Sequence, residues 1–133
     1  MNGEKTLTNL LKNMKPVVHP GDFVFCCVKN LENIDLKQLI CTFYEEEAIT
    51  LIISQSYADR IGLHYPFVAS WITLKIHSSL EAVGFTAAFS KALSDEGISC
   101  NVVAAYYHDH IFTHKADSAR AIEILERLGI NES

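Results

Sequence analysis

The stretch that decides the fold is Val68-Ala69-Ser70-Trp71-Ile72-Thr73-Leu74-Lys75-Ile76-His77, in the middle of the chain. Its apolar residues Val68, Ile72, Leu74 and Ile76 share one parity, whereas Thr73, Lys75 and His77 share the other. Successive side chains of a strand point to opposite faces of the sheet. The alternation therefore predicts a strand with one buried face and one more polar face.

A helix is predicted directly after this strand. Ser78-Ser79-Leu80-Glu81 has the form of a capping box, so the helix is expected to begin around Ser79 or Leu80. Gly97 marks its end. Gly84 falls inside the expected helix, where glycine costs about 1 kcal/mol relative to alanine, and this favours a close approach of backbone or ligand. The apolar residues at helical spacing are Ala82, Phe85, Phe89, Ala92 and Leu93.

The remainder of the C-terminal half continues the pattern. Strands are predicted over residues 98–107 and 110–114, and a last helix carries an apolar stripe and ends at Gly129. The half therefore has the order β-α-β-β-α. One further strand from the N-terminal half would complete a ferredoxin-like βαββαβ sandwich, an α+β fold with an antiparallel sheet.

The N-terminal half follows a similar plan on a similar scale. A short helix is predicted over residues 6–14, a buried strand over 23–28, and a hairpin from 36–44 and 49–53 with Glu45-Glu46-Glu47 at its tip. The stretch 36–44 is compatible with a strand or a short helix. A short helix over 57–61 is ended by Gly62. Tyr65-Pro66 is the best candidate boundary, which predicts two domains, residues 1–64 and 65–133.

Composition excludes several classes of protein. The 133 residues are 49% hydrophobic and 20% charged, which is typical of a globular protein. A formal net charge of −5 without a basic run argues against a nucleic-acid partner. There is no signal peptide and no apolar stretch of membrane-spanning length, so a soluble, cytoplasmic protein without a membrane partner is expected. Four cysteines without CxxC spacing favour reduced thiols over a disulfide framework.

Three runs of sequence resemble the ACT-domain family. Residues 73–86 (TLKIHSSLEAVGFT) resemble its first strand and helix start, and residues 92–103 (ALSDEGISCNVV) are similar to its helix end and second strand. Residues 106–112 (YYHDHIF) are similar to the third strand of a small bacterial tandem-ACT group. The resemblance is weaker over residues 1–64, which look like a degenerate first ACT unit. It implies two tandem ACT-like units and a non-catalytic regulatory protein that binds a small molecule, most simply an amino acid, and associates as a homodimer or larger homo-oligomer.

The same resemblance implies where a ligand binds. In ACT domains the ligand lies against the loop after the first strand and against the second strand. A helix start there offers unpaired backbone N–H groups that hold a carboxylate. An α-ammonium needs an acceptor, for which Asn101 and Asp109 are candidates. The expected ligand-binding residues are Ser78, Ser79, Leu80, Val83, Gly84, Phe85, Thr86, Cys100, Asn101, Val102 and Asp109.

Other interpretations of these residues stay open. Ser78 and Gly84 are also explained by capping and packing alone, and the whole chain by a structural dimerisation module without ligand. A metal site on the strand with His108 and His110, completed by His114 and Cys100, is a third hypothesis. Catalysis by Ser78, His77 and Asp109, or by Cys100 with a histidine, lacks any supporting motif. No phosphate-binding loop occurs, and no cofactor is expected.

Overall fold

The computed structural model describes residues 6–76 and 81–131, and the chain divides into two compact units. Unit 1 combines both ends of the chain, Met1–His19 and Ser70–Ser133, and unit 2 is the intervening segment Pro20–Ala69. Each unit is an antiparallel sheet with helices, which confirms the predicted α+β class and its ferredoxin-like βαββαβ arrangement. The domain boundary that the sequence predicts between residues 64 and 65 stays a prediction.

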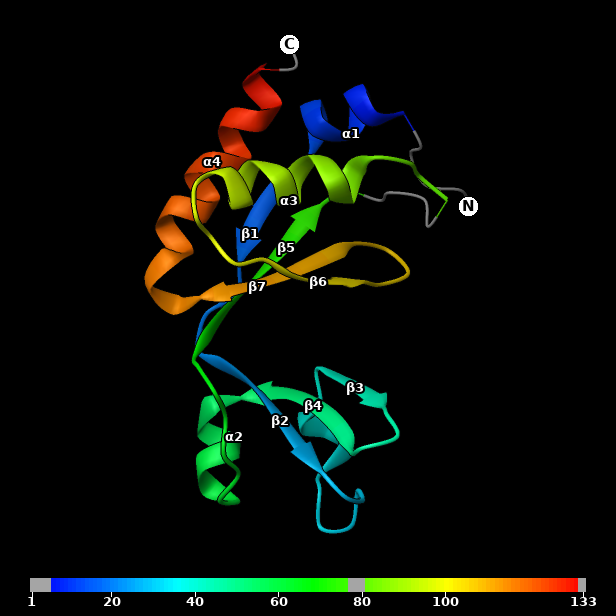
Figure 1. Cartoon of the computed structure of the whole chain (residues 1–133), viewed down its shortest axis with the longest axis vertical. Helices are drawn as coiled ribbons and strands as arrows, with labels where there is room; N and C mark the ends of the chain where they lie inside the picture. The colour runs from blue at the N-terminus through cyan, green and yellow to red at the C-terminus, as the bar shows by residue number, and fades with distance from the viewer. Residues whose placement is uncertain (1–5, 77–80, 132–133) are drawn as a thin grey trace. The chain divides into compact units, whose positions relative to one another are not determined.

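The sheet of unit 1 has the strand order β1-β5-β7-β6. The strands are β1 (Lys15–Val18), β5 (Ala69–Lys75), β6 (Asn101–Ala104) and β7 (Asp109–His114). Its helices are α1 (Leu7–Asn13), α3 (Phe85–Asp95) and α4 (Ser118–Asn131), and a short 3-10 helix, η2 (Lys115–Asp117), precedes α4. The three α-helices pack against one another beside the sheet (Figure 1).

The strand from the N-terminal half that joins the unit 1 sheet is β1, a stretch that the sequence analysis did not identify as a strand. It pairs with β5 in antiparallel register, with Val17 opposite Thr73 and Val18 opposite Ile72. The fourth strand of the unit 1 sheet, β1, therefore comes from a part of the sequence far ahead of its neighbour β5. The pairing confirms that the C-terminal half alone lacks one strand of its sandwich.

One face of the unit 1 sheet packs on the helices and forms the main core. Ile72, Leu74 and Ile111 come from the strands, and Phe85 and Phe89 of α3 meet edge to face with ring centroids 5.1 Å apart. The alternation in residues 68–77 correctly predicted which side of β5 faces this core. The other buried members are Leu10, Leu11, Met14, Leu93, Ile98, Ala121, Ile124 and Leu125.

Unit 2 repeats the plan in reduced form. Its sheet has the order β3-β4-β2, from β2 (Phe23–Val28), β3 (Cys41–Tyr44) and β4 (Ile49–Ser54), and Ala69 pairs with Phe23 beside β2. The stretch 36–44, which the sequence left open between a strand and a short helix, contains a 3-10 turn, η1 (Leu36–Gln38), followed by β3, and α2 (Gln55–Arg60) follows β4. Val24, Leu51 and Ile53 are fully buried beneath α2. The unit therefore has a small core and one short helix.

The predicted start of the helix after β5 is wrong. Glu81, Ala82 and Val83 are not helical, and α3 begins at Phe85 with Gly84 as its N-cap residue. Gly84 has φ +89°, a left-handed conformation that favours glycine, so it precedes the helix rather than interrupting it. The other half of the expected capping box, Ser78, lies outside the described residues.

Two further sequence expectations need correction. Thr73, placed on the polar face of its strand, is only 2% exposed because its hydroxyl joins a hydrogen-bonded cluster on that face. The last helix does not end at Gly129 but continues to Asn131. A Cβ built on Gly129 would lie 2.8 Å from the carbonyl oxygen of Leu11. Glycine therefore serves here for the close approach of α1 and α4, not for stopping the helix.

Gly129→Ala is expected to destabilise unit 1. In an exposed helix this change stabilises by about 1 kcal/mol, but here the added methyl group meets a backbone oxygen that cannot rotate away. We expect a net loss of about 1–2 kcal/mol, measured by urea unfolding. Ser94→Ala on the exposed side of α3 is the control and should change stability by less than about 0.5 kcal/mol. A stabilised G129A variant would show that the two helices are not in tight contact.

Candidate ligand site

The residues expected to bind a ligand near the start of α3 are only partly brought together. Val83 is 83% exposed beside Gly84, and Thr86 is exposed on the first turn of the helix. Phe85 is buried in the hydrophobic core of unit 1. Ser78, Ser79 and Leu80 lie outside the described residues.

The residues expected on the second strand divide between the two faces of the sheet. Cys100 and Val102 pack against the core on the helix-covered side. Asn101 is exposed, and its side-chain amide donates to the carbonyl oxygen of Phe112 across the sheet at 3.3 Å. Asp109 is 7% exposed at the start of β7 and already has an interaction partner. Of these four, Cys100 also lines a hollow on the surface of unit 1.

That hollow is a groove of about 610 Å³ between α3 and the segment leading into β6. Ile98, which is 2% exposed, supplies an apolar surface within it. Small side chains keep the groove open on the helix side. Its lining residues are Ala87, Ser90, Lys91, Ser94, Ile98, Ser99 and Cys100.

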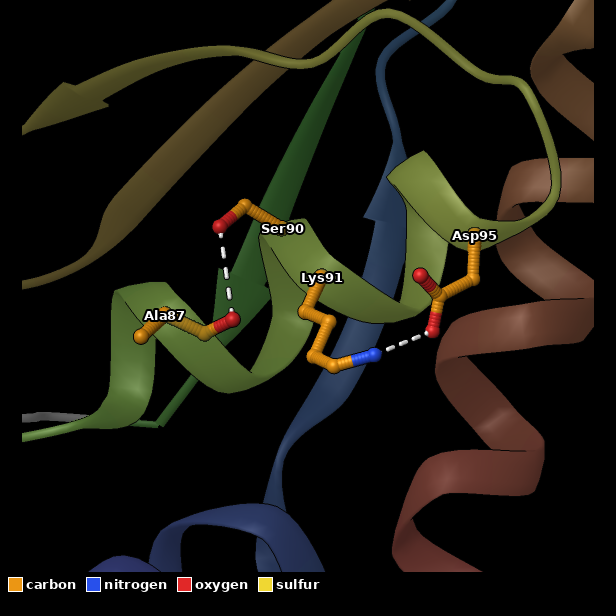
Figure 2. Close-up of polar contacts among 4 residues, drawn as sticks. All are labelled: Ala87, Ser90, Lys91 and Asp95. Atoms are coloured by element: carbon orange, nitrogen blue, oxygen red, sulfur yellow. Dashed lines mark hydrogen bonds and ion pairs between the residues drawn. The ribbon is translucent and has the colours of Figure 1, made fainter.

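The polar groups of the groove come mainly from α3. The hydroxyl of Ser90 donates to the carbonyl oxygen of Thr86 at 2.6 Å and lies 3.4 Å from that of Ala87. Lys91 forms an ion pair with Asp95 one turn later, with an Nζ–Oδ2 distance of 2.7 Å (Figure 2). Both side chains are largely exposed. Lys91 therefore places an ammonium group on the lining of the groove, and the Asp95 carboxylate lies beside it one turn farther along α3.

Cys100 is the thiol of this groove, and its environment makes it unreactive. Burial raises the pKa of Cys100 to about 11, so the thiolate is scarce at neutral pH. Cys100 also faces the helix-covered side of the sheet, whereas His110 takes part in a cluster on the other side. The arrangement does not provide a cysteine–histidine pair.

Two of the histidines considered as metal ligands, His108 and His110, already have other hydrogen-bond partners. The rings of His108 and His110 are 6.4 Å apart, and Nδ1 of His110 is engaged by Trp71 and Thr73. Within residues 6–76 and 81–131 no group of three His, Cys, Asp or Glu side chains is arranged to hold a metal ion. The metal hypothesis therefore gains no support from the described part of the chain.

The sequence analysis missed the residues of α3 that form the groove. Ala87, Ser90 and Ser94 recur at three- and four-residue spacing, which places them on one face of a helix. This second stripe of small and polar residues lies beside the apolar stripe of α3. Their spacing was the signal from which the groove wall could be predicted.

In the described part of the chain, no helix has the length and apolar character of a membrane span. No curated protein matches the sequence.

Solved structures similar to the chain include one with substantial sequence identity. A Vibrio cholerae protein of unknown function, VC0802, described as a possible transport protein, is 43% identical, with a TM-score of 0.84; the match covers 94% of this chain and 97% of that one. The regulatory subunit of aspartate kinase from Thermus thermophilus matches with a TM-score of 0.60 over 85% of this chain and 95% of its own, at 5% identity. Aspartate kinase from Clostridium acetobutylicum matches at 10% identity and a TM-score of 0.58, over 85% of this chain and 34% of its own. At such low identity the two aspartate kinase likenesses concern the fold alone.

Family comparison divides the sequence into two adjacent domains. One ACT-domain model matches residues 2–70, and a second ACT-domain model matches residues 67–127. The first match includes residues 2–19, which belong to unit 1 in the structure, so the matched ranges and the compact units do not coincide. The two matches show that the chain belongs to the ACT-domain family, whose members are typically ligand-binding regulatory modules.

Proposed function

We propose that this protein is a non-catalytic regulator that binds an amino acid in the groove between α3 and the segment leading into β6. The observation that carries the proposal is the Lys91–Asp95 pair on the groove-lining helix. An amino acid carries one carboxylate and one ammonium group. The lysine is suited to the first and the aspartate to the second, while Ile98 offers an apolar contact for a side chain.

Opening the ion pair for a ligand costs little. Exposed pairs of this spacing on a helix contribute only about 0.3–0.5 kcal/mol. A zwitterion that replaces the internal partners restores both charge contacts and adds hydroxyl contacts from Ser90, Ser94 and Ser99. The binding free energy then comes from new contacts and not from reorganisation of the protein.

Self-association is part of the same proposal. β6 is the last strand of the unit 1 sheet, so one of its backbone edges lacks a neighbouring strand within the unit. At the tip of the β6–β7 hairpin, Tyr106 and Tyr107 are 66% and 62% exposed. A second copy that pairs along this edge would cover the groove and convert ligand binding into a change of assembly.

Thermal unfolding of the full chain with each of the twenty amino acids tests this function. A ligand that binds only the folded protein stabilises it by about 2.7 kcal/mol at a concentration 100 times its Kd. We expect one chemical class of amino acid to raise the Tm, and Lys91→Ala and Asp95→Ala to abolish the shift. Arg127→Ala, which removes a second exposed ion pair of unit 1, is the matched control and should keep it.

Light scattering on the same samples measures the oligomeric state of the protein. We expect at least a dimer at micromolar concentration. If no amino acid shifts the Tm although the protein is dimeric, the chain is a structural dimerisation module and the sensing role is wrong. A shift that survives both groove variants would place the ligand elsewhere.

A further inference from the structure

A hydrogen-bonded cluster lies on the face of the unit 1 sheet opposite to the helices. Nε2 of His19 is 2.6 Å from Oγ1 of Thr73, which is 2.9 Å from Nδ1 of His110. Nε1 of Trp71 donates to the same Nδ1 at 3.1 Å. The rings of His19 and Trp71 are stacked 3.6 Å apart and 10° from parallel. Four residues from three strands or strand ends are thus joined in one cluster.

The chemistry of the donors fixes the direction of every bond in this cluster. The indole N–H of Trp71 is only a donor, so Nδ1 of His110 must be an acceptor without a proton. The Thr73 hydroxyl therefore donates to this nitrogen and accepts from Nε2–H of His19. Two donors share the one lone pair of Nδ1. The geometry requires a neutral His110 with its proton on Nε2.

The charged groups around His110 oppose a positive charge on its ring. From β1, Lys15 lies opposite Lys75 of β5, and both belong to this face. His19 at the end of β1 and His108 before β7 also face the cluster. His114 shares the parity of His110 on β7, while the opposite residue of β6, Val103, is uncharged. Among the described residues of these four strands, the single carboxylate is Asp109, whose parity is that of the helix-covered face.

The pKa values of both histidines shift in the direction that this arrangement requires. Burial lowers the pKa of His110, and His108, His19 and Lys75 lower it further. Burial and Lys75 lower the pKa of His19. A histidine with a lowered pKa in the folded state contributes stability that is complete above the ordinary value of about 6.5 and is lost as the pH falls below it. Acidification therefore acts against the cluster.

We propose that His110 is a proton-sensing site whose protonation at Nδ1 breaks the hydrogen bond from Trp71 and reverses the one from Thr73. A proton on Nδ1 would point at the indole N–H, which cannot reverse its role. Thr73 can rotate its hydroxyl and accept from Nδ1–H, because its oxygen has two lone pairs and can keep the bond from His19. The stack of His19 on Trp71 therefore loses its polar support at the indole N–H in this step.

The position of the cluster gives the switch a consequence. His19 is the last residue of the first segment of unit 1, and Trp71 is the second residue of the other segment. The backbone N–H of His19 also donates to the carbonyl oxygen of Trp71 at 2.9 Å. Both chain connections between unit 1 and unit 2 therefore leave unit 1 at the cluster. Protonation of His110 loosens the anchoring of these two connections.

Tryptophan fluorescence of the full chain reports the switch directly, because Trp71 is the single tryptophan. Between about pH 8 and about pH 5, we expect a red shift of emission with a midpoint below about pH 6.5. Far-UV circular dichroism should be unchanged over this transition. His110→Asn keeps an acceptor oxygen near the position of Nδ1 but cannot titrate in this range, so the transition should be lost. His114→Asn on the same strand is the matched control and should retain it.

The tautomer of His110 in the unmodified protein supplies a measurement that does not depend on a variant. Long-range ¹H–¹⁵N NMR at about pH 8 should show the neutral ring with its proton on Nε2. A proton on Nδ1, or a charged ring at that pH, would overturn the proposal. So would a fluorescence transition that persists in a folded H110N variant, or the absence of any transition above the pH of global unfolding.

Discussion

A fragment of residues 70–133 is expected to remain unfolded, whereas the same fragment extended at its C-terminus by residues 1–19 is expected to fold. The reason is that α1 and β1 belong to the core of unit 1. Leu10, Leu11 and Met14 are 0%, 3% and 8% exposed. Burying each such side chain contributes about 1.5–3 kcal/mol, and the whole domain is stable by about 5–15 kcal/mol. Their loss removes most of the stability of the unit.

The rearranged fragment is feasible because α1 and α4 are neighbours. Gly129 of α4 approaches the backbone of Leu11 closely. Residues 132–133 and 1–5 would form a connection of about seven residues, and an extended chain reaches about 3.3–3.6 Å per residue. No foreign linker is therefore needed. The new ends would be Ser70 and His19, which already lie beside each other in the paired strands β5 and β1.

Circular dichroism and urea unfolding of the two fragments decide the outcome. We expect a cooperative transition for the rearranged fragment and a featureless, non-cooperative signal for residues 70–133 alone. A third fragment, residues 65–133, corresponds to the domain predicted from the sequence and should also fail. Cooperative unfolding of either short fragment would contradict the assignment of β1 and α1 to unit 1.

Phe89→Ala is expected to cost about 3–5 kcal/mol of unfolding free energy. The Phe89 side chain is fully buried between the sheet and the helices and meets Phe85 edge to face. Its truncation removes apolar contacts and leaves a cavity beneath α3 that rigid neighbours fill only in part. Because Trp71 lies in unit 1, urea unfolding followed by its fluorescence reports this unit separately from unit 2.

Two further variants bracket the result. Phe89→Leu keeps most of the buried volume and should cost clearly less than the alanine variant. Val83→Ala, at a position 83% exposed, should change stability by less than about 0.5 kcal/mol. If F89A and V83A had equal effects, the core of unit 1 would not be centred on α3.

The sequence predicted the strands of this protein better than the beginning of its main helix. The alternation in residues 68–77 identified β5 and its buried face. When helices cover one face of a sheet, apolar and polar residues alternate along the strand, and this period of two is visible in the sequence. The helix start was misplaced because Ser78 and Glu81 have the spacing of a capping box. Gly84, in a left-handed conformation, is the N-cap residue of α3, and a single glycine in the sequence does not indicate this role.

The predicted ligand residues remain a prediction, and the sequence alone could not arrange them. Periodicity assigned Cys100 and Val102 to one strand, but it could not reveal the groove that Cys100 lines. The cluster of His19, Thr73 and His110 was beyond sequence analysis for another reason. Its members are separated by 54 and 37 residues, and no local pattern connects them.

The split origin of unit 1 also determines when it can form during synthesis. The α1 and β1 segments are translated first, but their partners in β5, α3 and α4 follow only after all of Pro20–Ala69. Unit 2 is continuous in sequence, so it can complete its own sheet while the leucines of α1 are still without a core. During synthesis the apolar residues of α1 therefore stay exposed until the second segment of unit 1 has been made. A chaperone that holds unfolded chains at the ribosome would bind at these residues.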